Sequence, residues 1–268
     1  MTKKTVVLFD MDGTLTPARK PAPDFLIPSL NKLSSFGLVG ILTGSDMNYL
    51  IQQCKRLWEG ENSCDPNKFV LLPCNGTKFY TWDGNDWSLE KSSNMRKELG
   101  DSTFDLLMKI LIGAQFTHIS SEPDHPLTGH FIQYRESMIN WCQVGRNADD
   151  EQRKKFIEYD SQTDMRYRLM IGVQTMVDKA IGENKIKFAL GGNTSVDIYP
   201  VGWDKTYGLS HFPNSECWFV GDRCEENGND KTIYDALSTS GRAYKTSGPE
   251  NTAEIIDEII SRLKNQQL

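Results

Sequence analysis

Residues 6–16 read VVLFDMDGTLT, a run of four apolar residues followed at once by two carboxylates and a glycine. A short continuous apolar run is typical of a strand that is buried on both faces inside a parallel sheet. Asp10 and Asp12 would then lie where this strand ends, and Gly13 permits a sharp turn there. Because open α/β sheets bind ligands outside the carboxyl ends of their strands, the stretch predicts both the fold class and the position of a site.

Two carboxylates at one strand end need a cation or a shared proton, because unpaired buried charges are costly. Mg²⁺ meets this need, since it prefers oxygen ligands and is commonly held by one or two carboxylates together with a substrate phosphate. The alternative is a solvated Asp-x-Asp-Gly turn. The position of the motif directly after an apolar strand favours the catalytic interpretation.

Composition excludes several classes of function. The chain has 268 residues, of which 38% are hydrophobic and 25% charged, as expected for a soluble protein with one large or two moderate domains. A formal net charge of −6 argues against a nucleic-acid partner. No apolar run approaches the roughly 18 residues that a membrane span needs, and no signal sequence precedes the first strand. We therefore expect a cytoplasmic protein without a membrane partner, whose six widely spaced cysteines are reduced thiols.

Apolar runs elsewhere in the chain outline the rest of the fold. Three of them predict further strands of the same sheet, at residues 38–42, 69–73 and 218–221. From about residue 86 the α/β rhythm gives way to a helix, a strand hairpin, two helices and two more strands. We therefore expect an α/β protein with a Rossmann-like parallel-sheet core, residues 1–85 and 199–268, and an inserted α+β cap domain, residues 86–198.

Polar residues follow the other predicted strands of the core. Thr43 and Ser45 stand at the start of a helix, where a hydroxyl either binds an anion or caps the helix. Asp222 is a third carboxylate at a strand end, and Asn229 and Asp230 add oxygen ligands nearby. The sequence thus predicts a metal and anion site at the carboxyl edge of the sheet.

Arginines gather at two places in this acidic chain. Arg19 lies in a proline-rich loop after the first motif, while Arg135, Arg146 and Arg153 come from a predicted strand, loop and helix start. Arginine suits bidentate binding of phosphate, so the last three could form a phosphate clamp. They could equally be surface arginines paired with neighbouring acids, and composition alone favours that alternative.

The motif at residues 9–16 resembles the phosphoaspartyl-transfer signature of the haloacid-dehalogenase-like superfamily. In that superfamily the first aspartate is the nucleophile and the second is the general acid/base, which are the positions of Asp10 and Asp12. A lysine between the insertion and the last aspartate offsets the negative charge, and Lys205 has this position. The resemblance leaves open whether Thr43 or Ser45 binds the transferring phosphoryl group.

Taken in order, the motifs resemble the eukaryotic phosphomannomutase family over nearly the whole chain. The matching segments are residues 9–16, 44–46, 144–146, 191–197, 202–205, 221–222 and 228–230. Cys74 and Thr43 stand where relatives usually have Glu and Gly. The segments around residues 58–67 and 120–125 look longer than usual.

The resemblance implies an isomerase that interconverts mannose 6-phosphate and mannose 1-phosphate and feeds GDP-mannose synthesis and glycosylation. A phosphorylated Asp10 and a hexose 1,6-bisphosphate, which also serves as activator, would carry the transfer. The implied Mg²⁺ ligands are Asp10, Asp12, Asp222, Asn229 and Asp230.

The resemblance also assigns substrate contacts and a partner. The sugar phosphate would be held by residues Arg19, Arg135, Asn140, Arg146, Arg153, Ser195 and Asp197, which favours the phosphate clamp. A homodimer through the cap domains is implied. The alternatives are a Mg²⁺-dependent sugar-phosphate phosphatase with the same core and a catalytically inactive sugar-phosphate-binding module. The preference for mannose over glucose does not follow from the sequence.

Overall fold

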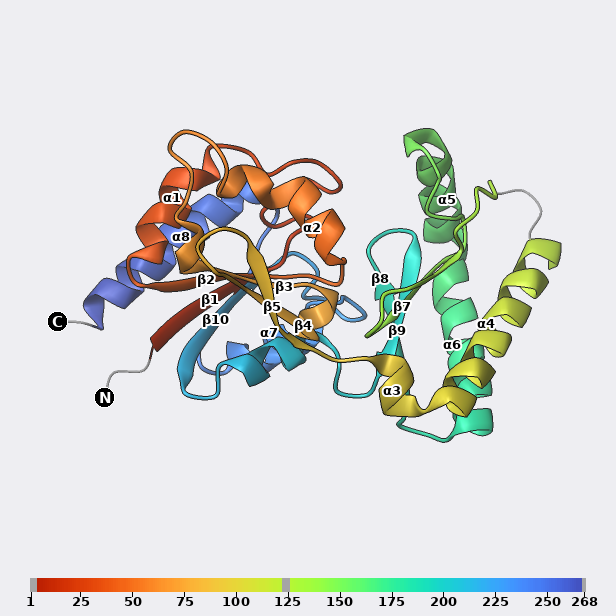
Figure 1. The fold of residues 1–268 in the computed structure, drawn as a ribbon. Coiled ribbons are helices and arrows are strands. Elements are labelled where there is room, and N and C mark those ends of the chain that lie inside the picture. The colour runs from red at the N-terminus through yellow and green to blue at the C-terminus, as the bar shows by residue number, and fades with distance from the viewer. Residues whose placement is uncertain (1–3, 122–125, 267–268) are drawn as a thin grey trace. The chain divides into compact units, whose positions relative to one another are not determined.

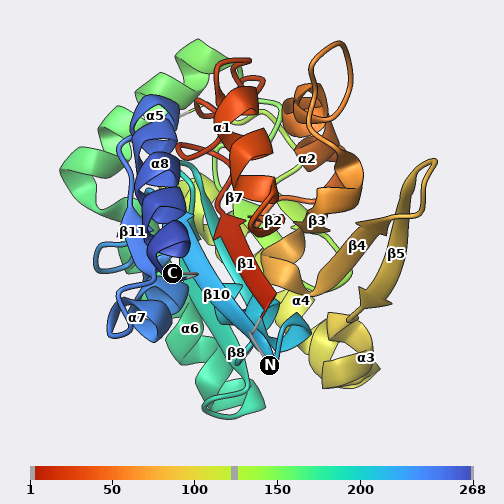
Figure 2. The ribbon, with the colours of Figure 1, turned by 90° about the vertical axis from the view of Figure 1, so that its left-hand side faces the viewer.

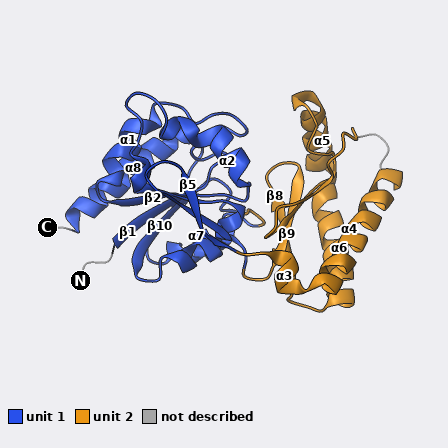
Figure 3. Ribbon diagram, viewed as in Figure 1, with its two compact units in different colours: residues 1–92, 203–226, 230–268 blue, residues 93–202, 227–229 orange. Residues whose placement is uncertain are grey.

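A computed structural model describes residues 4–121 and 126–266 of the chain. Their contacts form two units, coloured separately in Figure 3. The core unit comprises Met1–Ser92, Trp203–Glu226 and Asp230–Leu268, and the cap unit comprises Ser93–Gly202 and Asn227–Asn229. Each unit has its own sheet, so each is described by itself.

The core unit is built on a seven-stranded sheet of order β11-β10-β1-β2-β3-β4-β5 (Figure 2). Its strands are β1 Lys4–Phe9, β2 Gly37–Leu42, β3 Phe69–Leu72, β4 Lys78–Trp82, β5 Trp87–Ser92, β10 Ser215–Gly221 and β11 Ala243–Lys245. The strands from β11 to β3 are parallel, whereas β4 and β5 are antiparallel. The α/β class and the predicted central strands are confirmed, and β11 is a strand that the sequence did not predict.

Helices cover both faces of the core sheet. One face carries α1 Leu26–Ser34, α2 Met47–Cys54 and α8 Pro249–Asn265, and the other carries α7 Lys231–Ser238 and the 3₁₀ helix η4 Lys205–His211. The remaining 3₁₀ turns are η1 Lys55–Leu57, η2 Pro66–Lys68 and η3 Cys74–Gly76. This cover explains why β1 is apolar at every position from residue 6 to residue 9, since alternate side chains enter two different cores.

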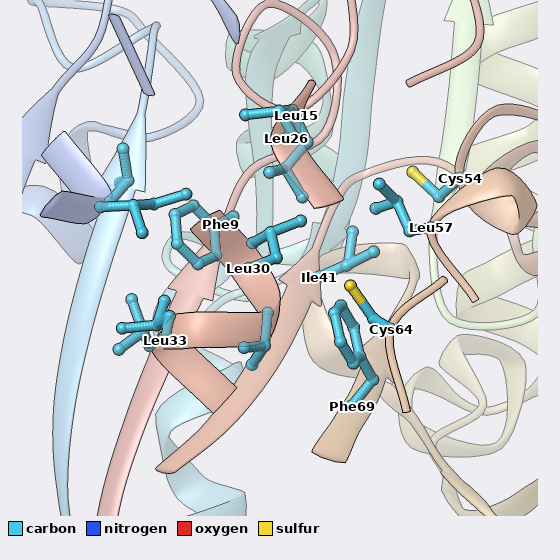
Figure 4. Close-up of a cluster of buried hydrophobic side chains, with 14 of the residues drawn as sticks. Phe9, Leu15, Leu26, Leu30, Leu33, Ile41, Cys54, Leu57, Cys64 and Phe69 are labelled. Atoms are coloured by element: carbon cyan, nitrogen blue, oxygen red, sulfur yellow. The ribbon is translucent and has the colours of Figure 1, made fainter. Parts of the chain in front are cut away.

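The larger of the two cores lies under α1 (Figure 4). The spacing of Leu26, Leu30 and Leu33 places all three on one face of the helix, where they pack against Phe9 and Ile41 of the sheet. Burial of such side chains is the main driving force of folding and holds the end of β1 rigidly. The carboxylates that follow β1 therefore start from a fixed backbone position.

The cap unit has a four-stranded antiparallel sheet of order β6-β7-β9-β8. Its elements are α3 Met95–Leu99, α4 Asp101–Ser121, β6 Ile132–Tyr134, β7 Ile139–Cys142, α5 Asp150–Thr163, α6 Met165–Ile181, β8 Ile186–Gly191 and β9 Ser195–Pro200. Helices α4 and α6 pack side by side against one face of this sheet (Figure 1). Asn140 and Asp197 are paired in register and therefore share the other face.

The unit boundaries differ by a few residues from the expected ones. The predicted hairpin around Asp83 is present, but β5 continues the core sheet, so the first boundary lies after Ser92. At the other end, β9 pairs with β8 up to Pro200, which moves the return to the core to Trp203. Strand pairing, which is non-local, decides both positions.

Two expectations concern the segments outside these elements. Over the described part of the chain, no helix is both long and apolar enough to span a membrane. The longer segment expected at residues 120–125 lies mostly outside the described residues, since the description of α4 ends at Ser121.

Candidate active site

Lys205 is the centre of the charged cluster in the core unit and is only 1% exposed. Its ammonium donates hydrogen bonds to the carboxylates of Asp10 and Asp230, which are 4% and 0% exposed. Burial disfavours the ammonium, but the two carboxylates outweigh it and hold the pKa of Lys205 above its usual value. The lysine is therefore charged, and the cluster is held by ion pairs that water does not reach.

Separate elements bring these three charges together. Asp10 directly follows β1, and its backbone N–H donates to the Val220 carbonyl of β10 at 2.9 Å. Lys205 begins η4, whose N-cap is Asp204; the Asp204 side chain accepts from the Thr206 N–H at 2.8 Å. Asp230 precedes α7. The carboxyl edge of the sheet thus gathers charges that lie up to 220 positions apart in the chain.

Asp222 follows β10 and lies against the turn at Gly13. A Cβ at Gly13 would come within 2.3 Å of the Asp222 Oδ2 atom, and this glycine has a φ of +83°. Only glycine accommodates both the left-handed backbone and this close approach. Packing between the two carboxylate-bearing loops therefore explains the glycine at position 13.

The carboxylates fit a hard cation. Asp10, Asp222 and Asp230 each offer an oxygen within 4.8 Å of the others, and Lys205 supplies one ammonium group against these three carboxyl groups. Burial raises the pKa of Asp10 well above its usual value, and the charge of Lys205 opposes this rise. The buried Oδ1 atom of Asp222 has no hydrogen-bond partner among the described residues. Burial and the charge of Asp230 raise the pKa of Asp222 to about 6. Oxygen ligands with surplus negative charge are what Mg²⁺ prefers.

The two last predicted metal ligands differ in their surroundings. Asp230 uses Oδ1 for Lys205, and its Oδ2 accepts from the Arg223 N–H at 3.0 Å. Asn229, the residue before Asp230, is half-buried and belongs to the cap unit. In the described structure Asp230 therefore orients Lys205, whereas Asp222 keeps an oxygen available.

Asp12 is held by the loop that follows it. Its Oδ1 atom accepts from the backbone N–H of Arg19 at 2.8 Å, and Arg19 has a left-handed φ of 61°. Burial raises the pKa of Asp12, while the hydrogen bonds from Arg19 and from the Gln53 side chain oppose the rise. A carboxyl group with a raised pKa is suited to exchanging protons.

Thr43 and Ser45 form the loop after β2. The Thr43 hydroxyl is buried and accepts from the Ser45 N–H at 3.1 Å, while the carbonyls of both residues accept from the turn η3. Within η3, Cys74 and Asn75 both have left-handed φ values, of 53° and 61°. The loop is thus fixed from two sides, and both hydroxyls remain candidates.

The cap unit has a second polar cluster, centred on Asn140. Its amide nitrogen donates to Ser195 Oγ at 2.9 Å and to Asp197 Oδ1 at 2.7 Å, and its oxygen accepts from Arg146 Nη1 at 2.8 Å. Asp197 lies over Gly191, where a Cβ would come within 2.6 Å of its carboxylate. Four predicted substrate residues are therefore joined in one network.

The other two cap arginines donate to neutral side chains. Arg153 Nη2 donates to the Thr194 hydroxyl at 2.8 Å, next to Ser195. Arg135 follows β6, and its guanidinium donates to Gln133 Oε1 at 3.2 and 3.3 Å. The predicted strand, loop and helix start are all present, and each arginine is anchored by a neutral side chain.

Two residues in these networks were not predicted from the sequence. Gln53 of α2 contacts Asp12, and Arg166 of α6 donates to the Gly192 and Ser195 carbonyls while it pairs with Asp160 at 2.7 Å. Gln53 is the last but one residue of α2, and Arg166 is the second residue of α6. Nothing in their sequence spacing distinguishes them from surface residues.

The fold is of the haloacid-dehalogenase-like type, in which a parallel sheet carries carboxylates at its strand ends and a second domain is inserted. Solved structures with this fold include the N-terminally truncated IMP-bound IMP-nucleotidase of Plasmodium falciparum, with a TM-score of 0.66 and 15% identity over 97% of this chain and 68% of that chain. A trehalose-6-phosphate phosphatase of Aspergillus fumigatus has a TM-score of 0.54 and 16% identity over 98% of this chain and 93% of that one. At these identities the likeness concerns the fold alone.

Sequence comparison narrows the assignment to one family. The family model described as eukaryotic phosphomannomutase matches residues 26–262. The chain is 31% identical to the phosphomannomutase of Encephalitozoon cuniculi, over 97% of this chain and 95% of that one, and 31% identical to that of Saccharomyces cerevisiae, over 96% and 95%. The protein belongs to the eukaryotic phosphomannomutase family.

Proposed function

We propose that this protein interconverts mannose 6-phosphate and mannose 1-phosphate through a phosphorylated Asp10 and a hexose 1,6-bisphosphate. The observation that carries the proposal is the buried cluster of Asp10, Lys205 and Asp230 beside Asp222, in a chain that belongs to the phosphomannomutase family. Such a cluster provides an anionic nucleophile and a fixed positive charge at one strand end.

In the proposed reaction the Asp10 carboxylate attacks phosphorus while Asp12 gives its proton to the departing sugar oxygen. In the reverse transfer Asp12 takes a proton from the accepting hydroxyl. The raised pKa of Asp12 supports this role. Lys205, and the hydroxyl of Thr43 or Ser45, would stabilise the charge on the transferring group.

Mg²⁺ would be held by the Asp10 and Asp222 carboxylates and by the backbone carbonyl of Asp12, with Asn229 and Asp230 completing its surroundings. When bound, it supplies positive charge to a transferring phosphoryl group. The surplus negative charge of the cluster and the unpartnered oxygen of Asp222 support this assignment.

The cap would hold the sugar phosphate that is not reacting. Arg135, Arg146 and Arg153 supply guanidinium groups, which suit bidentate binding of a phosphate dianion. Asn140 and Ser195 offer hydrogen bonds to sugar hydroxyls, and the family resemblance implies Arg19 as a further ligand of the sugar phosphate. Binding of a second phosphate distinguishes a mutase from a phosphatase, because a phosphatase has to bind only the phosphoryl group that it removes.

A homodimer through the cap is the expected assembly. Helices α4 and α6 pack together and expose large apolar side chains, among them Ile112, Phe116, Tyr167 and Ile171. Pairs spaced four residues apart form a stripe on each helix. Exposed apolar stripes of this kind commonly mark protein interfaces.

The state of the cysteines supports a cytoplasmic location. All six are free and buried in the structure, which agrees with the expected reduced thiols. Unpaired cysteines are usual in a reducing compartment.

The function is tested by ³¹P NMR of the purified protein with Mg²⁺, mannose 6-phosphate and a trace of hexose 1,6-bisphosphate. We expect a hexose 1-phosphate signal to grow without free phosphate. Growth of inorganic phosphate alone would show that water takes the phosphoryl group and that the protein is a phosphatase. Absence of both signals would indicate a binding module. Repeating the experiment with glucose 6-phosphate compares the two sugars.

A further inference from the structure

Gln53 is buried in α2 and faces the loop that carries Asp12. One end of its side-chain amide lies within hydrogen-bond distance of three acceptors: Asp12 Oδ1 at 3.3 Å, Thr16 Oγ1 at 3.0 Å and the Lys20 carbonyl at 3.0 Å. Among the described contacts, Gln53 supplies the side-chain amide that faces the Asp12 carboxylate, and the backbone N–H of Arg19 is the other donor to it.

The neighbours of Gln53 decide which end of its amide faces the loop. A hydroxyl has one proton, and that of Thr16 is donated to the Met11 carbonyl at 3.1 Å. Thr16 therefore accepts from Gln53, as the Asp12 carboxylate and the Lys20 carbonyl also must. The amide nitrogen points into the loop and shares its two protons among the three acceptors.

The same arrangement makes the two oxygens of Asp12 unequal. Its Oδ1 atom faces two donors, the Arg19 N–H at 2.8 Å and the Gln53 amide at 3.3 Å. A proton on the carboxyl group must then reside on Oδ2, because Oδ1 has no room for it. The backbone of Gln53 strengthens the attachment, since its carbonyl accepts from the Ala22 N–H at 2.8 Å.

We propose that Gln53 is a positioning residue for the general acid/base, fixing the Asp12 carboxyl group so that Oδ2 faces the oxygen that gains or loses the proton. The inference rests on the proposed function and adds a residue to it. Catalytic groups need such support, because a misplaced proton donor loses much of its effect.

The role can be isolated by the choice of phosphoryl donor. When a sugar bisphosphate phosphorylates Asp10, the bond from phosphorus to the sugar oxygen breaks, the bond to the Asp10 carboxylate forms, and the proton of Asp12 goes to the sugar oxygen. When acetyl phosphate is the donor, acetate leaves as a stable anion and needs no proton. Only the first reaction depends on a well-placed Asp12.

The experiment compares Gln53→Met with Gln52→Met. Methionine is unbranched and fills the space of glutamine without its amide, and Gln52 is the exposed neighbour on the same helix. We expect Gln53→Met to lower kcat with mannose 6-phosphate and hexose 1,6-bisphosphate by about tenfold to a hundredfold, with KM nearly unchanged. Phosphorylation of Asp10 by acetyl phosphate, followed by intact mass, should keep its wild-type rate in both variants.

Two outcomes would overturn the inference: equal loss with both donors, which indicates general damage to the core, and no loss relative to Gln52→Met. Should Gln53→Met not fold, Gln53→Glu serves instead. It keeps the shape but sets a carboxyl group against Asp12, and the same selective loss with the sugar donor is expected. Failure of the proposed function is separate, because the wild-type protein would then form no hexose 1-phosphate from mannose 6-phosphate.

Discussion

The core and the cap each gather polar side chains on one edge or face of a sheet, but they hold them by different means. In the core, Lys205 is buried between Asp10 and Asp230 by ion pairs, and the carboxylates outnumber the ammonium. In the cap, the neutral amide of Asn140 links Arg146 to Asp197 through hydrogen bonds. The two networks therefore differ in the kind of contact that holds them together.

This difference indicates what each cluster lacks. A cluster with surplus negative charge is incomplete without a cation, whereas guanidinium groups are suited to binding an anion such as phosphate. Damage to the core should therefore stop phosphorylation of Asp10 itself. Damage to the cap should weaken substrate binding and leave that chemistry intact.

The largest effect is expected for Asp10→Asn, which removes the nucleophile. Turnover of mannose 6-phosphate should fall by about 10⁴-fold or more, because no phosphoryl enzyme can form. The measurement is ³¹P NMR of the product together with a thermal unfolding scan. Asp24→Asn, which removes only a surface ion pair with Arg56, is the control and should keep full activity. An active, folded Asp10→Asn protein would refute the covalent step.

Lys205→Met should have the second largest effect, on stability. The substitution leaves Asp10 and Asp230 buried without their common partner, which costs about 3–5 kcal/mol of unfolding free energy. Urea denaturation at neutral pH measures the loss. Adding Asp230→Asn to the same protein should restore part of it, since one of the uncompensated charges is gone. A double variant as unstable as the single one would contradict this account of the cluster.

Arg146→Met tests the cap side of the contrast. The substitution removes the guanidinium group, which contacts Asn140 and is proposed to bind the non-reacting phosphate. The KM for mannose 6-phosphate should therefore rise by about tenfold to a hundredfold. Phosphorylation of Asp10 by acetyl phosphate should be unchanged. The matched control is Arg168→Met, an exposed arginine of α6, which should alter neither quantity. Slower phosphorylation of Asp10 in Arg146→Met would contradict the proposal that the core carries out the chemistry and the cap binds the substrate.

The smallest effect concerns Mg²⁺. An ion that binds the folded protein and not the unfolded chain should stabilise the protein by about 1.4 kcal/mol when its free concentration is ten times its Kd. This corresponds to a rise of a few degrees in Tm. EDTA should abolish the shift, and so should Asp222→Asn, whose oxygen has no other partner in the described structure. Asp24→Asn should retain it. A full Mg²⁺ shift in Asp222→Asn would place the ion elsewhere.

Local sequence predicted most of the elements of both units. Residues 6–9 were recognisable as a buried strand because all four are apolar, and Asp10 was placed at its end correctly. The short strand β11 was missed, since Ala243–Lys245 is too brief to show a period. The position of β5 was not predictable either, because Trp87–Ser92 alternates like any hairpin strand and only pairing with β4 assigns it to the core.

The sequence by itself determined the α/β class, the family, and the residue types at the ends of the strands, because these depend on short patterns in consecutive residues. Only the tertiary structure decided that Lys205 lies between Asp10 and Asp230, that Asn140 joins Arg146 to Asp197, and that Gln53 supports Asp12. The physical reason is that these contacts join residues far apart in the chain. They form when burial of apolar surface brings strand ends and helices together, and no local spacing encodes them.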